Sequence, residues 1–138
     1  MSISATKISR IQAANIRFYL ILTVASAIFG GVYELFSHYV YSYPMIYAFG
    51  YPLSALCFWV ILAFRSPRAV LKKAAAQLMR GGVFTLMIGS IIRGVLEIFG
   101  TTNRLTVWFW VLGGGMLLAA LIIQLLHKMK PITKTEQI

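Results

Sequence analysis

Four long apolar runs follow one another along the chain. They cover residues 18–36, 44–64, 81–100 and 105–126. A bilayer core about 30 Å thick needs roughly 20 apolar residues in a helix that rises about 1.5 Å per residue. The pattern predicts an all-α integral membrane protein, in which residues 1–138 form a single membrane domain built as a bundle of four transmembrane helices.

Two shorter stretches lie outside these runs. Residues 2–16 lean toward polar side chains, and residues 66–80 place apolar side chains on one face behind a proline. Such amphipathic stretches favour short helices that lie on the inner membrane surface.

The composition agrees with a membrane protein and argues against an enzyme. Charged residues make up 12% of the chain and hydrophobic residues 59%, whereas an average soluble domain has roughly 25% charged residues. The acids are Glu34, Glu97 and Glu136, and aspartate is absent. Carboxylate metal sites and phosphoryl-transfer sites need clusters of such residues. We therefore expect no catalytic residues, no metal site and no cofactor.

The basic residues predict the orientation. Eleven of the 13 lysines and arginines precede the first run, separate the second from the third, or follow the fourth, whereas loops 37–43 and 101–104 carry Arg104 alone. The positive-inside rule then places both termini in the cytoplasm. We expect the net charge of +10 to contact anionic lipids at the cytoplasmic face rather than nucleic acid.

A short sequence occurs twice. Residues 31–36 read GVYELF and residues 94–99 read GVLEIF, so that four of six positions are identical at an offset of 63 residues. Each copy ends an odd-numbered run. The chain is therefore predicted to be two repeated helical hairpins in the same orientation, related by an axis along the membrane normal.

Three charged residues lie inside the apolar runs. Glu34 and Glu97 each lie about 24 Å from the inner edge of their run, near the outer boundary of the hydrocarbon. Arg93 precedes Glu97 by four residues, so an ion pair is expected. If the first and third runs packed together, Arg93 would also reach Glu34, because the repeat places Gly30 opposite it. This cluster is either a cation or proton site or a packing lock, and we favour the lock.

Aromatic and small residues offer further candidates. Tyr33, His38 and Tyr47 would lie in the outer half of the first hairpin, where interfacial anchoring is the usual role of such residues; a vestibule for an organic cation is the alternative.

Small residues spaced four apart are typical of helix packing in membranes. They mark Gly30, Gly31, Gly94 and Gly115 as packing positions within a tight bundle or a dimer.

The segments GVYELFSHYVYSYPMIYAF and RGVLEIFGTTNRL resemble uncharacterised small four-span membrane proteins of Gram-positive bacteria. The likeness covers both hairpin tips, and it implies a multi-pass protein of the bacterial plasma membrane without an assigned activity. The layout is also similar to that of small multidrug exporters, whose glutamate lies at mid-membrane, unlike Glu34.

Two classes of function remain open. The first is a non-catalytic plasma-membrane protein, either a homo-oligomer or an accessory subunit of a transport or redox assembly. The second is a small transporter or channel in which Glu34, Glu97 and Arg93 form an outward-facing cation or proton site.

Overall fold

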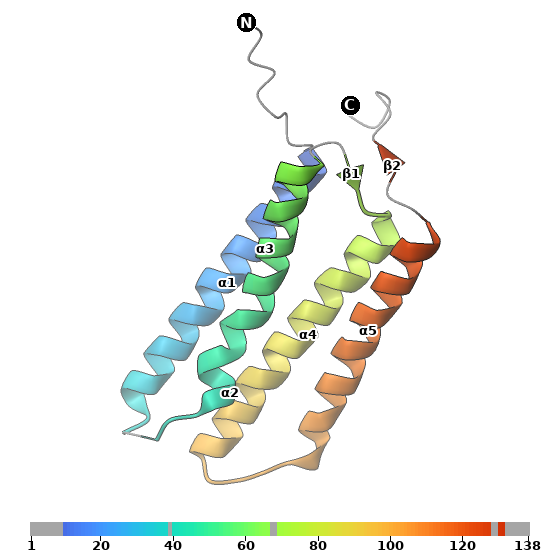
Figure 1. Ribbon diagram of the computed structural model, residues 1–138. Coiled ribbons are helices and arrows are strands. Elements are labelled where there is room, and N and C mark those ends of the chain that lie inside the picture. The colour runs from blue at the N-terminus through green and yellow to red at the C-terminus, as the bar shows by residue number, and fades with distance from the viewer. Residues whose placement is uncertain (1–9, 39, 67–68, 128–129, 132–138) are drawn as a thin grey trace, which may run out of the picture.

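The computed structural model describes residues 10–38, 40–66, 69–127 and 130–131, and four long helices dominate it (Figure 1). These are α1 (Arg10–Phe36), α3 (Gly50–Arg65), α4 (Lys73–Ile98) and α5 (Val107–Leu126). A short helix α2 (Tyr43–Ile46) and a 3-10 turn η1 (Tyr47–Phe49) lead into α3, and a second 3-10 turn η2 (Arg104–Thr106) leads into α5.

The prediction of an all-helical chain with four membrane-spanning candidates is confirmed. The spans Arg10–Phe36, Tyr43–Arg65, Lys73–Ile98 and Arg104–Leu126 are long and apolar enough to cross a bilayer. A short antiparallel pairing joins β1 (Ala69–Val70) to β2 (Lys130–Pro131).

The four helices pack in a simple order. α1 packs against α3, α3 against α4, and α4 most extensively against α5, whereas α2 and η1 contact both α1 and α4. α1 begins and α5 ends at the same end of the molecule, where the connection between α3 and α4 also lies (Figure 1). We call this the basic end, after Arg10, Arg17, Arg65, Lys72 and Lys73. The opposite end carries α2 and η2.

The helical parts of the two expected surface helices continue into the long helices, and residues 69–70 form β1 instead. α1 runs without a break from Arg10, and α4 runs from Lys73, so residues 10–16 and 73–80 continue into the spans. Residues 1–9 and 67–68 lie outside the described residues. The buried amide of Gln12 donates to the carbonyl oxygens of Ser66 and Ala69 at 3.1 and 2.7 Å, so the start of α1 packs against this connection. A polar residue at a helix start thus holds the connection between α3 and α4.

Glycines allow α4 and α5 to approach closely. A Cβ atom added at Gly82 would lie 2.9 Å from the carbonyl oxygen of Gly113, and one added at Gly113 would lie 3.0 Å from that of Gly82. Contacts this short leave no room for a side chain at either position. Close backbone approach at small residues is the usual way in which helices pack when water does not drive them together.

Candidate functional site

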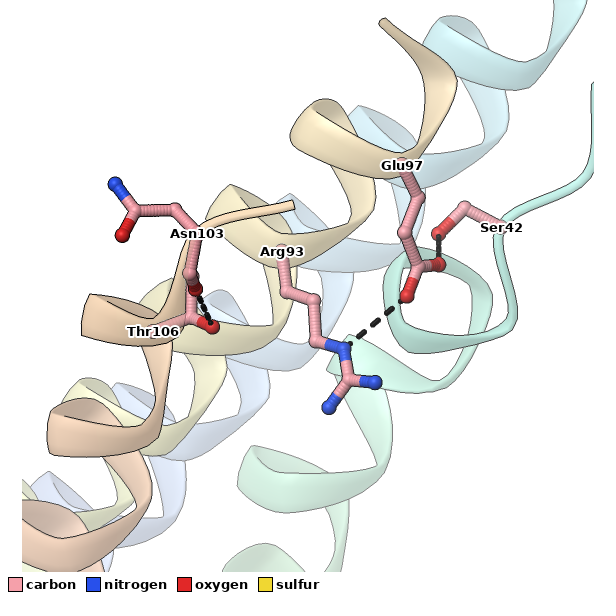
Figure 2. A network of polar contacts seen from close by, with 5 residues as sticks. All are labelled: Ser42, Arg93, Glu97, Asn103 and Thr106. Carbon is pink, nitrogen blue, oxygen red and sulfur yellow. Dashed lines mark hydrogen bonds and ion pairs between the residues drawn. The ribbon is translucent and has the colours of Figure 1, made fainter. Parts of the chain in front are cut away.

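The end of the molecule opposite the basic end contains a small polar network centred on Glu97 (Figure 2). Arg93 Nε donates to Glu97 Oε1 at 3.1 Å, and Ser42 Oγ donates to Glu97 Oε2 at 3.0 Å. Both oxygens of this carboxylate are therefore bonded to groups of the chain itself. Because Ser42 precedes α2 and Glu97 belongs to α4, the network joins the loop of the first hairpin to the second hairpin.

Local structure explains each contact. Arg93 and Glu97 are one turn apart on α4, which brings their side chains together as the spacing predicts. Their side chains are 51% and 34% exposed within the chain, so this pair lies at the rim of the molecule. Ser42 is buried, and its hydroxyl does not cap α2, so it is available to Glu97.

Met45 of α2 separates α1 from α4 beside this network. A Cβ added at Gly30 would lie 3.3 Å from the carbonyl oxygen of Met45, and one added at Gly94 would lie 2.5 Å from its Cβ. Gly30 on α1 and Gly94 on α4 therefore contact the same residue from two sides. The repeat pairs Gly94 with Gly31, yet Gly30, one position earlier, is the residue that packs in the matching way.

Glu34 is not joined to Arg93, contrary to the bridge that the sequence suggested. The reason is that α2 occupies the space between the ends of α1 and α4, so the two helices do not pack together there. One carboxylate oxygen of Glu34, Oε1, is buried and makes no hydrogen bond within the described residues. Glu34 thus remains a partly buried acid without a basic partner in the part of the chain that the structure describes.

Asn103 and Thr106, drawn beside the network in Figure 2, form a separate local cap. The side chain of Asn103 accepts a hydrogen bond from the backbone N–H of Leu105 at 2.9 Å, and Thr106 Oγ1 donates to the carbonyl of Asn103 at 2.7 Å. These bonds start η2 and take no part in binding Glu97.

The three candidate vestibule residues make contacts of their own. Tyr33 stacks on Phe29 of the same helix at 6.0 Å between ring centres. His38 is exposed, and its Nδ1 lies 2.9 Å from the carbonyl oxygen of Phe36. Tyr47 is exposed as well. Nothing found among the described residues joins these three side chains to one another.

The remaining glycine candidates lie on open faces. Gly31 and Gly115 are exposed, and a Cβ added at either would meet no atom within 4 Å. They do not pack within the chain, because each lies on the side of its helix that faces away from the other helices.

A second polar group, which the sequence interpretation missed, lies near the basic end. Arg80 Nε donates to Asn15 Oδ1 at 2.8 Å, and its guanidinium carbon lies 4.9 Å from the centre of the Phe18 ring. Asn15 in turn donates to the carbonyl of Ile11 at 2.9 Å. Gln12, Asn15 and Tyr19 follow helical spacing on one face of α1, a signal that was present in the sequence.

Within the described residues, no three histidine, cysteine or acidic side chains come together as ligands for a metal ion. Comparisons with protein families, with characterised proteins and with solved structures found no match to this chain.

Proposed function

We propose that the chain is a non-catalytic, multi-pass plasma-membrane protein that works as a homo-oligomer or as an accessory subunit of a transport or redox assembly. The observation that carries this proposal is that both oxygens of Glu97 are bonded within the chain, to Arg93 and to Ser42. A carboxylate used in this way fastens two parts of the chain together. The network is accordingly a lock between the two hairpins.

The uncovered helices agree with a role in a larger assembly. In the most apolar stretch of the last span, 11% of the residues are buried within the chain, and α5 contacts chiefly α4. Lipid or neighbouring protein must cover the rest of this surface, since large apolar faces are rare on monomers in water.

The proposed orientation puts the basic end in the cytoplasm. The described cations gather there, whereas Arg93 and Arg104 lie toward the other end, and short cytoplasmic segments are enriched in such residues. The proposal includes the two-hairpin repeat, the cytoplasmic location of both termini and a bacterial plasma membrane.

A transport experiment tests the proposal. We expect the purified protein in liposomes to show no proton or cation flux above that of empty liposomes, and Glu34→Gln to leave the signal unchanged. Glu97→Gln serves as the matched control. Like Glu34→Gln, it removes one negative charge, but it does so within the lock. Flux that disappears in Glu34→Gln while the variant still folds would contradict a non-catalytic, non-transporting role.

Glu34 Oε1, which has no hydrogen bond in the part of the chain that the structure describes, favours a second candidate function, a small transporter or channel. A buried carboxylate oxygen without a hydrogen bond is costly in an apolar medium unless it gains a proton or a cation. This candidate gives the opposite result in the same experiment, because it requires the flux that Glu34→Gln abolishes.

A further inference from the structure

Arg80 is held in a fixed place near the basic end, with no acid beside it among the described residues. Asn15 accepts from Nε, and the Phe18 ring lies against the guanidinium. These two contacts orient the planar group and leave its two terminal nitrogens without an acceptor among the described residues. Terminal N–H groups of arginine that lie in one plane can bind two oxygens of a phosphate or a carboxylate at once.

No acid among the described residues lies beside Arg80. On the neighbouring helix α1, Tyr19 is fully buried, and Trp59 packs beside it. The two glutamates that the structure describes, Glu34 and Glu97, belong to the far ends of α1 and α4. Within the described residues, the positive charge of Arg80 is therefore not balanced by the chain.

The position of Arg80 matches the depth of lipid headgroups. It follows Lys73, the first residue of α4, by seven residues, or about 10 Å along the axis. Side chains on a helix lean toward its N-terminus, and for α4 that direction leads to the basic end. Lys73 is exposed and lies two turns earlier on the same face. Two cations thus line one face of α4 between the headgroup region and the apolar interior.

We propose that Arg80 binds the phosphate of an anionic phospholipid between α1 and α4, and that Lys73 holds additional negative charge on the headgroup. The chemistry recognised is a phosphate ester. A lipid fits better than free phosphate because Arg80 lies against the apolar ring of Phe18 inside a span, where acyl chains would extend along the helices. The inference rests on the proposed membrane location and adds a specific ligand to it.

Native mass spectrometry of the full chain in detergent can test this, with phosphatidylglycerol and phosphatidylcholine titrated separately. We expect phosphatidylglycerol to bind more tightly, and Arg80→Gln to weaken that binding at least tenfold without changing phosphatidylcholine binding. Arg17→Gln is the matched control, because Arg17 is an exposed cation of α1 toward the basic end of the molecule. This substitution should weaken the binding of phosphatidylglycerol less than twofold. Arg80→Lys, which keeps the charge and loses the paired donors, should give an intermediate loss if Arg80→Gln does not fold.

Several outcomes would overturn the inference. Equal losses of phosphatidylglycerol binding in Arg80→Gln and Arg17→Gln would show that the lipid is attracted by general positive charge. Unchanged binding in Arg80→Lys would show that the paired donors of arginine are not needed. Displacement of the lipid by millimolar glycerol phosphate would assign the site to a soluble phosphate. A chain that inserts into bilayers but binds both lipids equally would refute the lipid site and leave the membrane assignment standing.

Discussion

At the scale of single residues, two hydroxyl side chains inside α1 donate to carbonyl oxygens of the preceding turn. Thr23 donates to the carbonyl of Tyr19 at 2.7 Å, and Ser26 donates to that of Leu22 at 2.8 Å. Such bonds are expected where water is absent, because an unpaired polar group there is costly. Ser42, which precedes α2, differs because it donates to the carboxylate of Glu97 on α4. Its bond therefore contributes to tertiary structure rather than to one helix.

Removing this hydroxyl should weaken the lock. Ser42→Ala leaves Glu97 Oε2 without its donor, and a hydrogen bond to a charged group contributes about 1.5–3 kcal/mol. We expect a loss near the lower limit, about 1.5 kcal/mol, because Glu97 is partly exposed. Reversible unfolding in mixed micelles measures it. Ser54→Ala is the control, since Ser54 is exposed and bonds within its own helix. Equal effects of the two substitutions would refute the lock.

At the scale of elements, glycine positions decide which helix faces meet. Gly82, Gly94 and Gly113 lie in close contacts, whereas Gly31 and Gly115 lie on open faces. Spacing alone cannot separate these groups, because it identifies a small-residue face without saying which neighbour covers it. The four long helices were predictable, since apolar length determines them. The insertion of α2 between α1 and α4 was not, because the contacts of Met45 with Gly30 and Gly94 join residues that are far apart in the sequence.

Alanine substitutions at Gly94 and Gly31, which occupy the same position in the two copies of the short sequence, should differ in their effect on stability. A Cβ at Gly94 would lie 2.5 Å from Met45 Cβ and 3.0 Å from Ser42 Oγ, so Gly94→Ala must push α2 away from α4. Such overpacking typically costs about 1–3 kcal/mol. Gly31→Ala meets no atom and should be neutral or stabilising by up to about 1 kcal/mol, because alanine favours helix. Thermal unfolding of both variants in one detergent measures this, and a destabilised Gly31→Ala would contradict the packing described.

At the scale of the whole molecule, the two ends have different chemistry. One end joins the hairpins through Glu97 and carries Glu34, which has no basic partner among the described residues. The basic end holds Arg80 and the connection anchored by Gln12. Within the first group, the spacing of four residues on one helix predicted the contact between Arg93 and Glu97, whereas Ser42 was not predicted as a partner. The sequence did not predict the second group, because Gln12 and Asn15 precede the apolar run, and their burial depends on α1 starting at Arg10.

Cysteine accessibility in intact bacterial cells tests the central claim, a multi-pass membrane protein with its basic end inside. In a Cys57→Ala background, single cysteines would replace Thr102 and Lys73, which are both exposed and lie toward opposite ends of the molecule. We expect a membrane-impermeant maleimide to label Thr102→Cys in intact cells, and to label Lys73→Cys only after the cells are permeabilised. Equal labelling of the two positions in intact cells, or labelling of Lys73→Cys alone, would contradict the account.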